Sequence, residues 1–228
     1  MSDTNSFGQP LGRLVDTPLP RPAPDHRPLT GRHIALVPLA PDHAKGFFDA
    51  FTDPAGWTYL GDDLPYETLA DAQSWTESLA TSRDPLFYTV LKDGEPLGFC
   101  SFLRITPAHG VIEIGYIHFA PALQGTPAAT EVQYLMMRHV FEDLGYRRYG
   151  WKCNALNAPS QKAAKRLGFT YEGLFRQAQV NKGRNRDTAW FSLLDHEWPQ
   201  QKRRFETWLE PSNFKPNGQQ IKRLEDCA

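Results

Sequence analysis

The sequence is poor in cysteine, and its histidines are scattered. Its 228 residues include three cysteines, Cys100, Cys153 and Cys227, and none of their spacings is typical of a metal site or a disulfide framework. The seven histidines include no H-E-x-x-H motif. We therefore expect a reducing compartment and no bound metal.

Long apolar runs and an excess of charge are also missing. No apolar stretch approaches the length that crosses a membrane, and the chain does not begin with a basic segment followed by an apolar one. Lys and Arg number 25 against 26 Asp and Glu, which gives a net charge of −1. This balance creates no field that favours nucleic acid or an anionic membrane. These absences predict a soluble cytoplasmic protein with no direct nucleic-acid or membrane partner.

Two nucleotide-binding fingerprints are absent, and the remaining pattern divides the chain into three parts. The sequence contains neither G-x-x-x-x-G-K-[ST] nor G-x-G-x-x-G, which excludes P-loop and dinucleotide-binding motifs. Residues 1–30 hold six prolines and predict an extended arm. Residues 31–198 predict one domain, and residues 199–228 a charged tail or helix with Trp208 and Leu209 as apolar anchors. The arm and tail permit a homodimer without requiring one.

Periodicity predicts a mixed α/β (α+β) domain. Runs rich in β-forming residues predict strands at 33–39, at 86–106 as a pair joined by Asp93-Gly94, and at 110–121, 148–155, 169–180 and 188–198. The last two strands flank a predicted turn at 181–187. Helical spacing predicts helices at 41–51, 67–80, 127–144 and 158–168. Alternation of strand and helix after residue 110 predicts one parallel pair.

The start of the third predicted helix resembles an anion-binding site. Gly125 lets a ligand approach the backbone, Thr126 is a suitable cap, and Pro127 suits the first helical position. A helix N-terminus attracts anions through its free N–H groups and its dipole. The alternative is an ordinary helix start. The apolar face of this helix is predicted to consist of Val132, Leu135, Met136, His139, Val140 and Leu144, with Glu131, Gln133, Arg138 and Asp143 mostly elsewhere.

Two downstream runs accompany this loop in a fixed order. The loop reads QGTPAA, and it is followed by NAPSQKAAKRLGFTYEGLFRQ and then by GRNRDTAWFSLLDHEW. With these three segments the sequence resembles the Gcn5-related N-acetyltransferase superfamily, and within it the branch that acetylates ribosomal-protein N-termini. The resemblance covers roughly residues 33–198 and includes the Q/R-x-x-G-x-G/A loop pattern of that superfamily.

The resemblance implies both a fold and a ligand. The fold is a mixed, mostly antiparallel sheet with helices on both faces, and its parallel strand pair splays into a V-shaped acetyl-CoA cleft. A bulge in the first strand of the pair exposes backbone groups of Ile117 and Phe119, Asn157 bonds the pantetheine, and Ser160 lies near the sulfur. The implied acetyl-CoA contacts are Ile117, His118, Phe119, Gln124, Gly125, Thr126, Pro127, Ala128, Ala129, Thr130, Asn157, Ser160, Lys162 and Lys165.

The sequence departs from the superfamily pattern at two positions. Pro127 stands where the loop pattern has its middle glycine, which removes one N–H donor. Ala164 stands where many members carry a tyrosine that protonates the leaving thiolate. In the branch resembled here a serine replaces that tyrosine, and it corresponds to Ser160.

Ser160, Glu113 and Asn157 are the predicted catalytic residues, each with a structural alternative. A hydroxyl at Ser160 suffices to stabilise a thiolate, because a thiol pKa near about 8.5 makes the thiolate a fair leaving group. The alternative for Ser160 is a helix cap. Glu113 is a candidate base acting through water, or a solvated strand glutamate. His118 is a second candidate base or a structural histidine. Lys162, Lys165 and Arg166 either meet the CoA phosphates or lie on a solvated helix face.

These residues favour transfer of an acetyl group from acetyl-CoA to an amine in a ternary complex. A site with a weak or water-relayed base suits an α-amine, because a pKa near about 8 leaves roughly a tenth of it neutral at pH 7. The expected acceptor is a protein or peptide N-terminus, such as that of a ribosomal protein. One alternative acceptor is a small amine, such as an antibiotic or polyamine. The non-enzymatic alternative is a CoA-binding regulatory module, for which Ala164 is the only indication.

Overall fold

An eight-stranded sheet organises residues 3–227, the part of the chain that the computed structural model describes. The strand order is β1-β2-β3-β4-β5-β6-β8-β7, and every neighbouring pair is antiparallel except β5 and β6. This mixed sheet with a single parallel pair confirms the predicted fold class. The strands are β1 (Leu29–Thr30), β2 (Ala35–Pro38), β3 (Leu86–Lys92), β4 (Glu95–Thr106), β5 (Val111–Phe119), β6 (Arg148–Asn154), β7 (Thr170–Asn181) and β8 (Arg184–Leu194).

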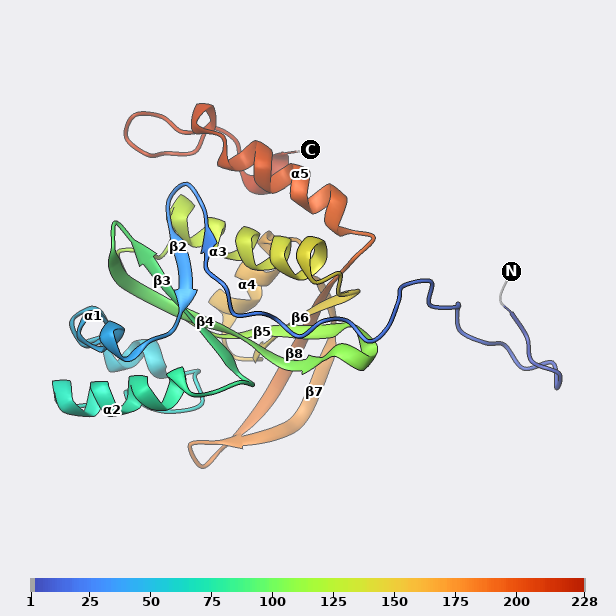
Figure 1. The fold of residues 1–228 in the computed structure, drawn as a ribbon, viewed down its shortest axis with the longest axis horizontal. Helices are drawn as coiled ribbons and strands as arrows, with labels where there is room; N and C mark the ends of the chain where they lie inside the picture. Colours follow the sequence, from blue (N-terminus) through green and yellow to red (C-terminus); the bar gives the residue numbers. More distant parts are fainter. Residues whose placement is uncertain (1–2, 228) are drawn as a thin grey trace.

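Helices cover both faces of the sheet (Figure 1). They are α1 (Ala44–Ala50), α2 (Leu69–Ala80), α3 (Pro127–Arg138), α4 (Ala158–Arg166) and α5 (Trp198–Leu209). Short 3-10 turns occur at Pro41–His43, Pro54–Trp57, Pro107–His109, Pro211–Asn213 and Leu224–Asp226. None of the helices among residues 3–227 is long and apolar enough to span a membrane.

Side-chain alternation along the strands separates two hydrophobic cores. In β3, Tyr88 and Val90 join the larger core beneath α3, α4 and α5. Phe87 points to the other face and joins Phe47 and Phe99 in the smaller core beneath α1 and α2. The period of two explains this division, because successive strand side chains lie on opposite faces.

Glu131 and Gln133 of α3 are buried, contrary to the prediction that they lie mostly off the buried face. The Glu131 carboxylate accepts backbone N–H groups from Arg32, His33 and Ile34, at 2.7–3.1 Å. These donors belong to the turn that joins β1 to β2. A buried charge is tolerated there because several hydrogen bonds replace its water. The carboxylate therefore joins the N-terminal hairpin to α3.

The helix predicted at 127–144 ends its α-helical part at Arg138. Residues His139–Asp143 form a π-helical turn, in which the Leu144 N–H donates to the His139 carbonyl at 3.0 Å. Gly145 follows with a φ of +66°, a left-handed conformation that suits glycine at a helix C-terminus. The position of Gly145 as the helix end is confirmed, while the wider last turn was not predicted.

The last hairpin is tighter than predicted. Its strands run to Asn181 and from Arg184, so the turn consists of Lys182 and Gly183 rather than residues 181–187. The second strand ends at Leu194 instead of Trp198, which begins α5. Polar residues in this hairpin obscure the strand pattern because β7 is largely exposed.

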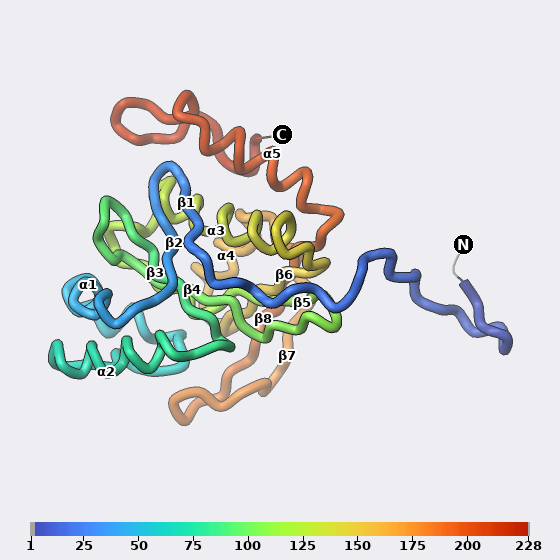
Figure 2. Tube along the Cα trace, viewed as in Figure 1, coloured from blue at the N-terminus to red at the C-terminus, as the bar shows by residue number. Residues whose placement is uncertain are grey.

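Both ends of the chain extend beyond the sheet, and Figure 2 follows them along the backbone. The first part of the N-terminal arm projects away from the domain, whereas residues 21–28 run across the surface of the domain. Arg27 forms an ion pair with Asp143 at 2.6 Å, and the His26 ring contacts the Phe87 carbonyl at 2.6 Å. At the other end, α5 packs on α3, where the Tyr134 hydroxyl donates to Glu206 at 2.9 Å.

Candidate active site

The parallel strands β5 and β6 separate to form an opening in the sheet. They pair only where Val111–Ile114 lies beside Arg148–Trp151, although both strands continue further. A shift in the β4–β5 register marks a bulge at Tyr116, whose φ is +49°. The predicted V-shaped cleft and bulge are therefore present, and a cavity of about 1660 Å³ runs through the opening.

Two walls of this cavity lie on opposite faces of the sheet. We call the first the helix-side wall, and it comprises Gln124–Pro127, Ala129, Thr130, Gln133, Asn157, Ser160, Arg166 and the C-terminal residues Trp208, Phe214 and Gly218–Gln220. We call the second the strand-side wall, and it comprises Arg104, Glu113, Lys152, Arg186, Thr188 and Trp190. Ile117, His118 and Phe119 line the cavity along β5 between them.

The loop before α3 presents a backbone donor to the cavity. Gly125 has a φ of +70°, and its N–H makes no hydrogen bond within residues 3–227. Thr126 caps the helix, because its hydroxyl accepts the Ala129 N–H at 3.3 Å. The Gln124 amide donates to the Phe119 carbonyl at 2.7 Å and joins the loop to the end of β5. This geometry suits an anion at the helix N-terminus.

Ser160 lies at the start of α4, beside the end of β6. Its hydroxyl oxygen accepts the Trp151 indole N–H at 3.1 Å, so its one hydrogen can be donated to the Cys153 sulfur or to a ligand. The Asn157 side-chain oxygen accepts the Ser160 backbone N–H at 3.0 Å and caps α4. Burial raises the pKa of the nearby Cys153 thiol, an effect that hydrogen bonding to Ser160 partly offsets. Both Ser160 and Asn157 line the cavity.

Three of the predicted acetyl-CoA contacts lie outside the cavity. Ala128 is buried in the core, where only 2% of its surface is exposed. Lys162 and Lys165 are exposed and line a separate groove beside the C-terminal segment. Arg166, the third candidate for the CoA phosphates, lines both spaces and donates to the Thr130 hydroxyl at 3.1 Å.

The strand-side wall is rich in positive charge. The Glu113 carboxylate is 8% exposed and lies 3.0 Å from both the Arg104 guanidinium and the Lys152 ammonium. Lys152 also lies over the Trp190 ring, 4.1 Å from its centroid. Burial lowers the pKa of Lys152, while Glu113 acts in the opposite direction. Glu113 is therefore held by two cations, and its role as a base stays a prediction.

His118 lies in an aromatic enclosure at the edge of the cavity. Its ring centroid is 4.4 Å from that of Phe51 and 4.6 Å from that of Trp57. Burial lowers its pKa to about 4. A neutral imidazole with so low a pKa is a weak base at pH 7, so the surroundings favour the structural alternative.

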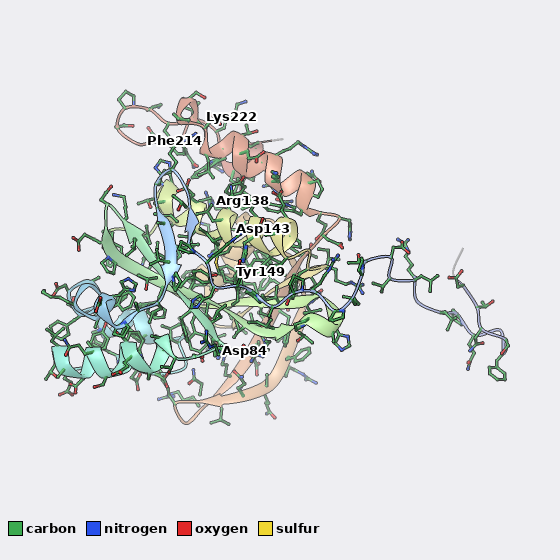
Figure 3. All side chains as sticks on the ribbon, in the orientation of Figure 1. Asp84, Arg138, Asp143, Tyr149, Phe214 and Lys222 are labelled. Atoms are coloured by element: carbon green, nitrogen blue, oxygen red, sulfur yellow. The ribbon has the colours of Figure 1, made fainter. Side chains whose placement is uncertain are left out.

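The sequence reading missed the contribution of the C-terminal segment. Phe214 and Lys222, labelled in Figure 3, lie in this segment beside α5. The Phe214 ring packs against Trp208 at 5.1 Å, and Arg166 lies 5.0 Å from the Trp208 ring centroid. The only available signal was the isolated aromatic residues in an otherwise charged tail. Within residues 3–227 no cluster of three or more His, Cys, Asp or Glu side chains is arranged to hold a metal ion.

The comparison with known families agrees with this geometry. Residues 33–170 match the acetyltransferase (GNAT) domain. The chain belongs to the GNAT acetyltransferase family. It is therefore an N-acetyltransferase, and the resemblance found in the sequence is confirmed.

Individual GNAT relatives extend the likeness beyond the matched residues. The crystal structure of a GCN5-related N-acetyltransferase from Brucella melitensis is 45% identical, with a TM-score of 0.90, over 92% of this chain and 98% of that one. The uncharacterized N-acetyltransferase p20 of Bacillus licheniformis is 34% identical over 65% of this chain and 85% of the relative. The ribosomal-protein-serine acetyltransferase of Escherichia coli is 32% identical over 64% of this chain and 84% of the relative.

Proposed function

We propose that this GNAT enzyme transfers the acetyl group of acetyl-CoA to the α-amine of a protein or peptide. The observation that carries the proposal is the opening between β5 and β6, whose cavity is lined by both Gly125, with its unpaired N–H, and Ser160. A diphosphate at the start of α3 and a thioester passing between the strands fit this arrangement. Likeness to the ribosomal-protein-serine acetyltransferase supports a protein acceptor.

The helix-side wall also offers groups that suit the nucleotide end of acetyl-CoA. Gln133 is 2% exposed, and neither its side-chain nitrogen nor its oxygen has a hydrogen-bond partner within residues 3–227. An amide of this kind pairs with the edge of adenine, which offers a donor beside an acceptor. Phe214 and Trp208 provide aromatic surface, and Arg166 provides positive charge. Lys162 and Lys165 extend that charge outside the cavity.

The chemistry requires a stabilised thiolate and a neutral amine. Acetyl-CoA supplies a thioester that is already activated toward amines. Ser160 donates its hydroxyl hydrogen to the thioester sulfur as charge develops there, while Trp151 holds the hydroxyl oxygen in place. Asn157 fixes the backbone of Ser160. A dedicated strong base is unnecessary, because roughly a tenth of an α-amine with a pKa near about 8 is neutral at pH 7.

Release of free thiol tests the proposal directly. The purified protein is incubated with acetyl-CoA and with peptides, lysine-containing blocked peptides, polyamines and aminoglycosides. We expect thiol release with unblocked peptides and little with acceptors whose only amine is a lysine side chain. Tight CoA binding without thiol release from any amine would overturn the proposal and favour the regulatory module. Faster release with polyamines or aminoglycosides than with any peptide would instead favour the small-amine alternative.

A further inference from the structure

The strand-side wall carries a net positive charge that its own carboxylate does not neutralise. Arg104 and Lys152 share the single carboxylate of Glu113. Arg186 forms no ion pair within residues 3–227, and burial lowers the pKa of its guanidinium. Glu113 is the only acidic residue among the described residues that line the cavity. Three cations therefore face one anion.

The same wall holds unused hydrogen-bond donors. Arg186, Thr188 and Trp190 alternate along β8, which places their side chains on the same face. The Arg186 Nε, the Thr188 hydroxyl and the Trp190 indole nitrogen are all buried and have no partner within residues 3–227. Two of these atoms can only donate, and the hydroxyl can do so as well. Buried donors without partners are rare in folded proteins, so such a row indicates a ligand that supplies oxygen acceptors.

The face on which these residues lie points to the acceptor rather than to acetyl-CoA. Tyr149, Trp151 and Cys153 of β6 belong to the core beneath α3 and α4. Lys152 alternates with them and therefore lies on the opposite face, with Trp190 beside it in the β6–β8 pairing. The proposed acetyl-CoA site occupies the helix-side wall, so the strand-side wall is left for the amine.

From these observations we infer that the acceptor carries an anionic group close to its amine, as in a peptide whose second residue is acidic. Arg186 and its neighbouring donors bind that group, with Arg104 and Lys152 adding to the field. The inference rests on the proposed function and narrows its substrate class. It disfavours polyamines and aminoglycosides, because a cationic acceptor would meet like charge.

The cationic wall also helps the amine to react. Like charges close to an ammonium group disfavour its charged form and lower its pKa. An acceptor amine bound near Lys152 and Arg104 is therefore neutral more often than in water. This effect gives a reason why the site functions with Glu113 already paired. The positive field of this wall would weaken binding of a cationic amine, and the anionic group of the acceptor compensates for that loss of affinity.

Matched peptides measure this preference. Three peptides differ only in having aspartate, asparagine or lysine at the second position. As a small-amine arm, glutamate α-amide is compared with glutamine α-amide, which differ only in the side-chain carboxylate. We expect kcat/KM by thiol release to be at least about tenfold higher for the aspartate peptide than for the asparagine peptide, and lowest for lysine. The preference should shrink as salt is raised. A larger ratio for the two α-amides than for the aspartate and asparagine peptides would overturn the peptide acceptor and assign the site to a small anionic amine.

Arg186→Gln identifies the residue responsible, with Arg184→Gln as the control. Arg184 is exposed on the same strand and does not line the cavity, so its loss makes the same charge change elsewhere. We expect Arg186→Gln to abolish most of the preference, Arg186→Lys to retain part of it, and Arg184→Gln to leave it unchanged. Melting curves identify any variant that fails to fold. If Arg186→Gln does not fold, the loss of preference for the aspartate peptide is measured in Arg186→Lys and Arg104→Gln instead.

The outcomes separate this inference from the proposed function. Equal kcat/KM for the three peptides would overturn the inference and leave N-terminal acetylation intact. An equal fall in kcat/KM for all three peptides in Arg186→Gln would give Arg186 a structural role and would also overturn the inference. Absence of thiol release with every acceptor, together with CoA binding, would overturn both.

Discussion

The two walls of the cavity are built in different ways. The helix-side wall depends on backbone geometry, with a left-handed glycine, a capped helix start and a second capped helix at Asn157. The strand-side wall depends on charged side chains drawn from β4, β5, β6 and β8. Backbone geometry suits acetyl-CoA, the ligand that all such enzymes would share. Side chains, which vary more readily, suit an acceptor that differs from one enzyme to another.

This difference explains which features a sequence reveals. Most residues of the two short segments 124–130 and 157–160 line the cavity, so neighbours in the chain are neighbours in the site. Arg104, Lys152 and Arg186 meet only after strands far apart in the chain have paired, and no local pattern marks them. Mutations in the helix-side wall should therefore affect acetyl-CoA binding and the chemical step, whereas those in the strand-side wall should affect kcat/KM for the acceptor.

The largest expected effect comes from Ser160→Ala. Loss of its hydroxyl should lower kcat about 10- to 1000-fold, the range for removing a general acid or a transition-state donor. CoA affinity should barely change, because the Asn157 cap bonds the Ser160 backbone and not its side chain. Steady-state kinetics and calorimetric titration measure the two quantities.

Trp151→Phe is the matched control for Ser160. It removes the N–H that holds the hydroxyl at 3.1 Å and leaves the hydroxyl itself in place. Its effect on kcat should be smaller than that of Ser160→Ala. Wild-type turnover in the alanine variant would show that Ser160 only begins the helix.

Most of the fold was predictable from the sequence, because its elements have strong local periods. The Asp93-Gly94 turn, α2, α4 and the strand pair around the third helix follow the predicted pattern. Glu131 was misplaced because its partners are backbone N–H groups about a hundred residues earlier, which no local pattern records. The charged wall was missed for the same reason. In both cases the location of a charged side chain is set by pairing between distant segments and not by the solvent exposure that its polarity would predict.

The next effect concerns stability at low pH and involves His118. Its folded pKa of about 4 lies below the unfolded value of 6.5, so protonation favours the unfolded chain as pH falls below 6.5. Between pH 7 and pH 5 this histidine should remove about 2 kcal/mol of stability. His118→Phe should lessen the loss by about that amount, as measured by denaturant unfolding at both pH values.

The other histidines provide an internal comparison. Burial also lowers the pKa of His26 and His43, and both remain in His118→Phe. Part of the acid sensitivity should therefore persist in the variant. An unchanged difference between pH 7 and pH 5 would mean that His118 titrates normally and that its aromatic enclosure admits water.

Gly125 tests the helix-side wall with a smaller expected effect. A Cβ at this position would meet no protein atom within 4 Å, so it would project into open space. Gly125→Val should weaken acetyl-CoA binding at least about tenfold, or about 1.4 kcal/mol, because it blocks approach to the backbone. It should also lower the stability of the free protein by about 1–2 kcal/mol, because a left-handed φ is unfavourable for valine.

Gly125→Asn separates these two causes. Asparagine tolerates a left-handed φ, so the free protein should keep most of its stability, whereas its Cβ still obstructs the ligand. We expect acetyl-CoA affinity to fall in both variants by calorimetric titration. Wild-type affinity in Gly125→Asn would mean that glycine supplies only the turn, and wild-type affinity in Gly125→Val would mean that the loop is an ordinary helix start.

The smallest effect should come from Lys165, when it is compared with its neighbour Arg166. Lys165 is exposed and outside the cavity, and exposed ion pairs contribute only about 0–1 kcal/mol. Lys165→Gln should therefore raise the KM for acetyl-CoA by no more than about threefold. Arg166 lines the cavity and donates to Thr130, so Arg166→Gln should raise KM about five- to tenfold.

Salt distinguishes the two positions further. A phosphate contact by an exposed lysine is screened, so any effect of Lys165→Gln should vanish at high ionic strength, while that of Arg166→Gln should persist. Melting curves should accompany both variants, because Arg166 also packs on Trp208. A larger KM change for Lys165→Gln than for Arg166→Gln would move the nucleotide end of acetyl-CoA out of the cavity and into the groove along α4. In that case the C-terminal segment would shape the groove, and Gln133 would no longer be a ligand of adenine.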